Sequence, residues 1–218
     1  MPLGIVTGLT AEARIARPLG DTEAGGGTPF GAEIAAEKLV GRGATALLSF
    51  GLAGGLDPAL KPGDLLVPMA VIEHGIVART NETLSEKIGG WVGGTLFAAE
   101  RIVVDPQAKR RLRATSGAGA VDTESGAVAR VAARHDIPFA VLRAICDNAN
   151  RTLPPAALIA LDAKGAIGVG AVLGSVLRHP GQIAGIVGVG RDAAAARRAL
   201  IRRVGDLVRA NRGGLLVL

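Results

Sequence analysis

Short, continuous apolar runs alternate along this chain with segments in which apolar residues recur at helical spacing. The runs are Leu3 to Thr7, Thr45 to Phe50, Asp64 to Val67 and Phe139 to Ile145, and the helical segments include Ala32 to Val40, Ser125 to His135 and Asp192 to Ala210. Strands that alternate with helices are typical of α/β proteins. We therefore expect residues 1–218 to form a single α/β domain with a mainly parallel or mixed sheet and a helical C-terminal segment from about residue 153.

Three connecting segments carry more specific expectations. Thr10 is expected to cap a helix that begins near Ala11. The stretch GLAGGL, Gly51 to Leu56, is expected to turn the chain after a strand. Residues 81–94 are polar and contain glycine, which favours a loop or a hairpin.

The composition narrows the class of protein. Apolar residues make up 49% of the chain and aromatic residues only 2%, so small side chains must fill the core. A single cysteine excludes an internal disulfide and suits a reducing cytoplasm. The histidines have no ligand spacing, so no metal is expected. The N-terminus has no basic leader before its apolar stretch, so it is not expected to be a signal peptide.

The net charge of +6 comes mostly from arginine. Nucleic acid is disfavoured as a partner, because aromatic residues do not interleave the basic ones. The segment Asp192 to Ala210 places an apolar stripe beside several arginines. The stripe favours a helix that packs on the sheet, and the alternative is a surface that faces an anionic membrane. The apolar stretch from Gly165 to Leu177 is too short to span a bilayer.

Two carboxylates stand where apolar runs give way to loops. Glu124 precedes a predicted helix, and Asp147 follows the predicted strand Phe139 to Ile145. If the strands are parallel, both side chains reach the same edge of the sheet, where α/β proteins bind ligands. The turns at Gly8 and at GLAGGL should open on that edge too. The structural alternatives are a charge that favours a helix N-terminus for Glu124 and a cap or turn residue for Asp147.

Three stretches resemble the purine nucleoside phosphorylase and nucleosidase superfamily. GIVTGLTAE is similar to the family's first strand and turn, SFGLAGGLDPALKPGDLLVP to its glycine-rich nucleoside loop, and VDTESGAVARVAARHDIPFAVLRAICDNAN to its ribose-binding and catalytic segment. The resemblance implies a three-layer domain in which helices flank a central mixed, mainly parallel twisted sheet. GLTAEARIA and the tail LPPAALIALDAKGAIGVGAVLGSVLRHPGQ are most similar to the hopanoid-associated phosphorylase group.

The resemblance also implies roles for individual residues. Glu124 would accept hydrogen bonds from the ribose hydroxyls, with Thr123 beside it, and Asp147 would act as the general acid at purine N7. Ala53 and Gly54 would let the backbone approach the nucleoside. Gly8 would belong to the binding site, and Phe97 could stack on adenine, with core packing as the alternative.

The acceptor of the sugar is less determined. Hydrolytic relatives carry a glutamate that activates water, but alignment on Gly8 puts Ala13 at that place and Glu12 one residue earlier. Phosphorolytic relatives hold phosphate with an arginine and a serine or threonine, and the corresponding places here hold Ser49 and Leu52. Arg14, Gly8 and Thr10 are an alternative anion site. The sequence favours water slightly, with Glu12 as the catalytic residue.

We therefore expect cleavage of the N-glycosidic bond of an adenine nucleoside, with adenosylhopane as the favoured substrate. The alternatives are a soluble nucleoside such as methylthioadenosine, and a nucleoside-binding module without activity. No cofactor is expected, with inorganic phosphate as the alternative co-substrate. The protein is expected to be a cytoplasmic homo-oligomer, with contact to the inner face of the membrane through its arginine-rich helix as the alternative.

Overall fold

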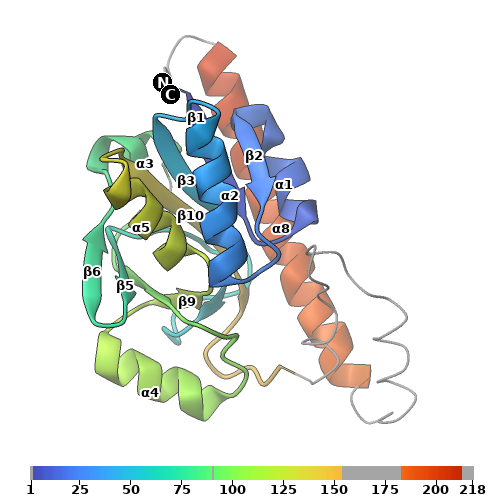
Figure 1. Cartoon of the computed structure of the whole chain (residues 1–218). Helices are drawn as coiled ribbons and strands as arrows, with labels where there is room; N and C mark the ends of the chain where they lie inside the picture. The colour runs from blue at the N-terminus through green and yellow to red at the C-terminus, as the bar shows by residue number, and fades with distance from the viewer. Residues whose placement is uncertain (1, 90, 154–182, 213–218) are drawn as a thin grey trace.

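In a computed structural model of the chain, the structure describes residues 2–89, 91–153 and 183–212, and within them ten strands form one sheet between helices (Figure 1). The elements in chain order are β1 (Leu3–Thr7), α1 (Thr10–Ala16), the 3₁₀ helix η1 (Arg17–Leu19), β2 (Asp21–Ala24), α2 (Pro29–Gly41), β3 (Ala46–Gly55), β4 (Leu65–Val67), β5 (Ala70–Glu73), β6 (Ile76–Arg79), α3 (Glu82–Ile88), β7 (Trp91–Val92), β8 (Thr95–Ala98), α4 (Pro106–Ser116), β9 (Ala120–Asp122), α5 (Ser125–Arg134), β10 (Phe139–Asp147) and α8 (Ile183–Arg212).

The sheet is mixed and mainly parallel. Its strand order is β6-β5-β8-β9-β3-β10-β4-β7, and β1 joins β3 and β2 beside this path. Six of the nine strand pairings are parallel, and the antiparallel ones are β5 with β6, β3 with β9, and β10 with β4. The expected fold class, a single α/β domain with a mixed, mainly parallel sheet, is therefore confirmed.

Side chains of the central strands alternate between two apolar layers. Along β10, Phe139, Val141 and Ile145 pack with helices α2 and α5, whereas Ala140, Leu142 and Ala144 pack on the opposite face. That second face is covered by α8, together with α1 and α3 (Figure 1). This period of two, with a helical layer on each face, explains why the buried strands are almost continuously apolar.

The position of Arg143 interrupts this apolar pattern. Its place in β10 puts it on the same face as Val141 and Ile145, next to Ser49 of β3 across the sheet. Both residues are buried. A buried arginine needs anionic partners, so this point of the sheet must be polar.

Three of the local predictions are wrong. GLAGGL is not a turn, because β3 continues to Gly55 and pairs with both β10 and β9. Residues 81–94 contain helix α3, whose N-cap Asn81 accepts a hydrogen bond from the Leu84 N–H at 2.9 Å. Helix α1 begins at Thr10 after the N-cap Leu9, so Thr10 is not the cap.

The predicted C-terminal helix packs on the sheet. Leu200, Val204 and Leu207 of α8 are buried, whereas Ile201 of the same helix is exposed. Within residues 2–89, 91–153 and 183–212, no helix is long and apolar enough to cross a membrane. The apolar stretch at 165–177, and the start of the segment expected from about residue 153, lie outside the described residues.

Candidate active site

A cavity of about 210 Å³ opens where β1, β3, β9 and β10 end. Its lining combines backbone, apolar side chains and carboxylates: Gly8, Leu9, Glu12, Gly27, Leu52, Ala53, Gly54, Arg101, Ile102, Val103, Val121, Asp122, Thr123, Glu124, Cys146, Asp147, Leu153, Val189 and Ala193. A mostly apolar cavity with a few converging polar groups is the usual form of a small-molecule site. The cavity therefore identifies the candidate active site.

The strands that carry the two predicted carboxylates are not all parallel. β10 runs parallel to β3, but β9 runs antiparallel to it, with Gly54 opposite Val121. The condition of the sequence argument, that both carboxylates follow parallel strands, is therefore not met. Glu124 and Asp147 still meet at one cavity, because β3 is long enough to pair with β10 and β9 at the same point.

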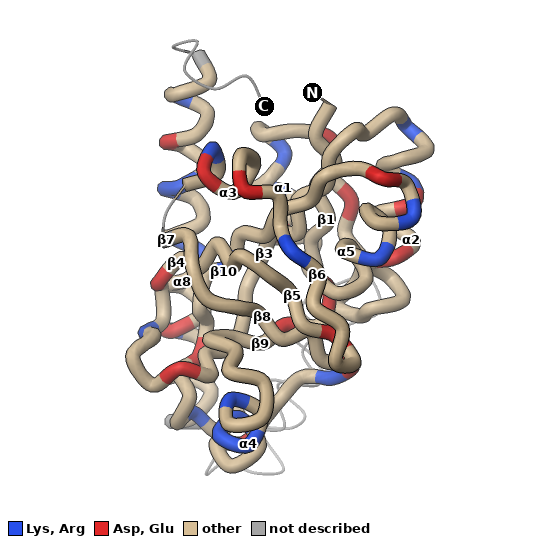
Figure 2. The backbone as a smooth tube through the Cα atoms, turned by 90° about the vertical axis from the view of Figure 1, so that its left-hand side faces the viewer, with Lys and Arg blue, Asp and Glu red and all other residues tan. Residues whose placement is uncertain are grey.

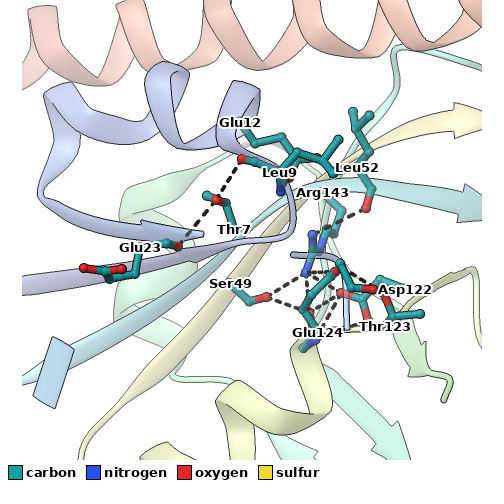
Figure 3. A network of polar contacts seen from close by, with 12 residues as sticks. Thr7, Leu9, Glu12, Glu23, Ser49, Leu52, Asp122, Thr123, Glu124 and Arg143 are labelled. Atoms are coloured by element: carbon teal, nitrogen blue, oxygen red, sulfur yellow. Dashed lines mark hydrogen bonds and ion pairs between the residues drawn. The ribbon is translucent and has the colours of Figure 1, made fainter. Parts of the chain in front are cut away.

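A buried network of charged and polar side chains lies on one side of the cavity (Figure 3). The Arg143 guanidinium lies 2.5 Å from Asp122 Oδ2 and 3.1 Å from Glu124 Oε2, and it donates to Ser49 Oγ at 2.7 Å. Burial alone would lower the pKa of Arg143, but the carboxylates of Asp122, Glu124 and Glu12 outweigh it and raise this pKa. Arg143 is thus held charged, and it fixes the position of Glu124.

Asp122 connects this network to the start of α5. Its Oδ2 accepts a hydrogen bond from Ser125 Oγ at 2.5 Å, and burial raises the pKa of its carboxyl to about 6, against the opposing effect of Arg143. Ser125 Oγ also lies within hydrogen-bond distance of Ser49 Oγ, at 3.0 Å. These contacts tie the start of α5 to the centre of the sheet.

Glu12 points into the same region from α1. Its Oε2 accepts from the Leu9 N–H at 2.8 Å, and its Oε1 accepts from the Leu52 N–H at 3.0 Å. The first bond follows from the helix start, because a glutamate at the third position of a helix reaches back to the N-cap N–H. Burial, together with the nearby charge of Glu124, raises the pKa of Glu12 to about 7. A carboxyl group with this pKa exchanges protons near neutral pH.

Two glycines make room for these carboxylates. A Cβ atom at Gly8 would lie 2.7 Å from Glu124 Oε1. At Gly51, where φ is +154°, a Cβ would lie 2.7 Å from Arg143 Nη1 and 2.9 Å from the Glu12 carboxyl carbon. Larger residues at either place would displace the charged groups of the site.

Asp147 is buried at the end of β10, and its partner is a lysine. Asp147 Oδ2 forms an ion pair with Nζ of Lys109, which also donates to the Asn148 carbonyl at 2.9 Å. Asp147 Oδ1 accepts from Cys146 Sγ at 3.4 Å. Burial raises the pKa of the Cys146 thiol well above its usual value, so this residue contributes a neutral group to the cavity wall.

The cavity brings together most of the residues predicted from the sequence. Those that line it are Gly8, Glu12, Ala53, Gly54, Thr123, Glu124 and Asp147. Thr123 Oγ1 donates to Glu124 Oε1 at 2.9 Å. Phe97 is not among the described residues that line the cavity, because it packs beside it against Leu56, Ala118 and Val121. Its stacking on adenine stays a prediction.

The alternative anion site is not assembled at this cavity. Arg14 is exposed and lines a different hollow of about 710 Å³ between α1 and α8, together with Arg197 and Arg209. Ser49 is buried behind the cavity with Arg143, and Leu52 presents an apolar side chain to it. In the part of the chain that the structure describes, no cluster of ligating side chains could hold a metal.

Sequence reasoning missed Arg143, Asp122 and Lys109. Arg143 could have been found from the sequence, because a single charge inside the apolar run FAVLRAIC needs a buried partner. Lys109 could not, since it stands among the exposed arginines of a polar helix.

Comparison with known proteins agrees with the geometry of the cavity. The sequence profile of the phosphorylase superfamily matches residues 22–86 and 82–166, which is more than half of the chain. The chain belongs to the phosphorylase superfamily. The matched residues include β3, β9, α5 and β10, and thus most of the elements that form the cavity.

Two curated relatives from this superfamily are similar over part of their length. They are 5'-methylthioadenosine/S-adenosylhomocysteine nucleosidases of Mycobacterium bovis and Mycobacterium tuberculosis, each 27% identical over 154 residues, which is 49% of this chain and 60% of the relative. The matched region therefore spans less than two thirds of the length of these relatives.

Solved structures show the same fold at low sequence identity. The corresponding nucleosidase of Neisseria meningitidis, with methylthio-immucillin-A, has a TM-score of 0.71 at 15% identity and covers 96% of this chain and 99% of its own. That of Colwellia psychrerythraea, in complex with adenine, has a TM-score of 0.68 at 17% identity, with 95% and 96% covered. Futalosine hydrolase of Helicobacter pylori has a TM-score of 0.66 at 16% identity, with 94% and 97% covered. The fold of this chain is thus similar to the fold of these three solved structures.

Proposed function

We propose that this protein cleaves the N-glycosidic bond of a purine nucleoside, with water as the acceptor. The observation that carries the proposal is the meeting of Glu12, Glu124 and Asp147 at one largely apolar cavity. The family membership supports it, as does the similarity to curated nucleosidases.

Glu124 suits the sugar. Its two oxygens can accept hydrogen bonds from vicinal hydroxyls, and Arg143 and Thr123 already orient the carboxylate. Gly8 and Gly27 lie beside it and leave space for a ribose ring. The nucleoside would therefore bind with its diol on Glu124.

In this proposal Glu12 acts as the base and Asp147 as the acid, on either side of the sugar–base bond. Glu12 bonds to Leu52, while Asp147 lies opposite Gly54. Residues two apart in a strand are separated by about 7 Å, which leaves room between the carboxyls for a scissile bond and a water molecule.

The proposed reaction conserves protons and atoms. Glu12 takes one proton from water, whose oxygen bonds to C1' of the sugar, while the bond from C1' to N9 breaks. Asp147 donates one proton to N7 of the leaving purine, so that the base departs neutral and the electron pair of the broken bond stays with it. Exchange with solvent then restores both carboxyl groups.

Water rather than phosphate is favoured by the charges at the site. Glu12, with a pKa of about 7, is ionised in part at neutral pH and is suited to accept a proton. The positive charge of Arg143 is already shared by Asp122 and Glu124, which leaves less of it for a phosphate anion. Inorganic phosphate as a co-substrate is the alternative.

Adenine is the proposed base, and the substituent at the 5' carbon sets the finer specificity. Adenosylhopane is the favoured substrate because of the resemblance in the N-terminal stretch and the tail. Methylthioadenosine is the second candidate, favoured by the similarity to the two mycobacterial nucleosidases. A cytoplasmic location and a homo-oligomeric state also belong to this proposal, and contact with the inner face of the membrane through α8 is the alternative.

The test is release of free adenine from adenosylhopane and from methylthioadenosine, each with and without phosphate, in water enriched in oxygen-18. Mass spectrometry should find adenine and a ribosyl product that carries the heavy oxygen. Formation of a phosphorylated sugar would show that phosphate, and not water, is the acceptor. A protein that binds nucleoside but releases no adenine would refute the enzymatic reading. Asp147→Asn should nearly abolish release and leave the fold intact.

A further inference from the structure

Helix α4 buries one side chain deeply, and that side chain carries a charge. Of the residues of α4, Lys109 is 0% exposed, whereas the neighbouring Arg110 and Arg111 are exposed. Figure 2 shows how strongly basic this helix is. Burial of an ammonium group is unfavourable without an anionic partner. A lysine near a helix N-terminus also meets the positive end of the helix dipole. Both the burial of the ammonium group and its position near the helix N-terminus are unfavourable for α4. The position of Lys109 must therefore be explained by something other than the stability of this helix.

The partner of Lys109 is the proposed acid of the reaction. Its Nζ contacts Asp147 Oδ2 and donates to the Asn148 carbonyl at 2.9 Å, so both bonds fix the chain at the end of β10. The other carboxyl oxygen, Oδ1, lies 3.4 Å from Cys146 Sγ and about as close to the place that a Cβ of Gly54 would occupy. Cys146 and Gly54 both line the cavity, and Lys109 does not.

The two oxygens of Asp147 therefore have different surroundings. Oδ2 is held from outside the cavity by an ammonium group, and Oδ1 remains on the cavity side. A carboxyl group that is free to rotate would present either oxygen, or neither, to a bound purine. Placement of a reacting group within a small angular range contributes strongly to rate.

We propose that Lys109 is a positioning residue for glycosidic cleavage. It holds Oδ2 of the Asp147 carboxyl group and so aims Oδ1 at the purine. The inference rests on the proposed function, because it assigns a task within that reaction. Lys109 touches neither sugar nor base and acts through Asp147.

The first test removes the ammonium group. With the adenine nucleoside that the wild-type protein cleaves, Lys109→Ala should lower kcat by about 10²-fold, the lower end of the range for a general acid, and change KM by less than about threefold. Arg110→Ala, an exposed change on the same helix, should keep the wild-type kcat. Ethylammonium added to Lys109→Ala should restore activity saturably, whereas ethanol should not.

The second test asks whether Lys109 acts through Asp147. In the Asp147→Asn background, adding Lys109→Ala should change the residual rate by less than about threefold, because the acid has already been removed. An effect of Lys109 on the rate that does not pass through Asp147 would instead give losses that multiply. A loss caused by a disturbed fold would not be restored by ethylammonium. If Lys109→Ala does not fold, Lys109→Met keeps the apolar stem, and the same loss of kcat is expected.

The outcomes separate the two proposals. If the wild-type protein releases no adenine from any nucleoside tried, the proposed function falls and this inference falls with it. If the wild-type protein is active and Lys109→Met, correctly folded, retains its kcat, only the role of Lys109 is overturned. Multiplicative losses in the double variant overturn it as well.

Discussion

Glu12 should make the protein less stable as the pH rises from 5 to 8. Burial and the charge of Glu124 raise the pKa of Glu12 from 4.5 to about 7 in the folded chain. Between these values the folded state keeps a proton that the unfolded state releases. The stability that this proton contributes is complete below pH 4.5 and is lost progressively as the pH rises through 7.

The size of the effect follows from the pKa. A rise from 4.5 to about 7 corresponds to a total of about 3.4 kcal/mol, since one pKa unit is worth about 1.4 kcal/mol. Integration over the measurable range leaves about 2.5 kcal/mol between pH 5 and pH 8. Glu12 is almost fully buried, so solvent screening reduces this figure little.

Glu12→Gln isolates this contribution, because the amide does not titrate and Asp122 remains in both proteins. Urea unfolding at pH 5 and at pH 8 should show a fall in the free energy of unfolding that is smaller in the variant by about 2.5 kcal/mol. Glu86→Gln, at an exposed position of α3, is the matched control and should keep the wild-type fall. Equal falls in the wild type and Glu12→Gln would refute the assignment of a buried, proton-binding Glu12.

Three further predictions concern the same cavity. The rate of adenine release should rise with pH through about 7 in the wild type, because the base must be ionised, and a pH profile of Glu12→Gln should lack this rise. Arg143→Met leaves Asp122 and Glu124 without their cation, so urea unfolding should show a loss of about 3–5 kcal/mol; a loss below 1 kcal/mol, as expected for exposed Arg110→Met, would contradict the network. Gly8→Ala crowds Glu124 Oε1, so steady-state kinetics should show a raised KM; an unchanged KM would place the sugar elsewhere.

Local chemistry made much of the fold predictable. The strands β1 and β10 and the helix α5 follow directly from apolar runs and helical spacing, and they lie within two residues of their predicted bounds. The prediction failed at GLAGGL, since a glycine-rich stretch continues as a strand when partners on both sides satisfy its backbone. It failed at residues 81–94 as well, because the capping signal of Asn81 precedes only a short helix.

The carboxylates were predictable one by one, but their surroundings were not. Glu124 and Asp147 stand out as charges at the ends of buried segments. Glu12 was in doubt, since a shift by one residue turns a helix side chain by about 100°. The structure places Glu12 at the cavity because α1 begins after Leu9, which aims the third residue of the helix at Leu52.

The layered α/β architecture and the carboxylates at the strand ends can be predicted from the sequence alone, because both depend on patterns within short segments. Which cation pairs with which carboxylate depends on the tertiary fold. Arg143 meets Asp122 and Glu124, and Lys109 meets Asp147, across 38 residues of chain in the last case. Such pairs follow from strand order and register, and nothing in a segment's own composition encodes its neighbour in the sheet. The physical reason is that burial makes each of these charges depend on a partner that only folding brings within reach.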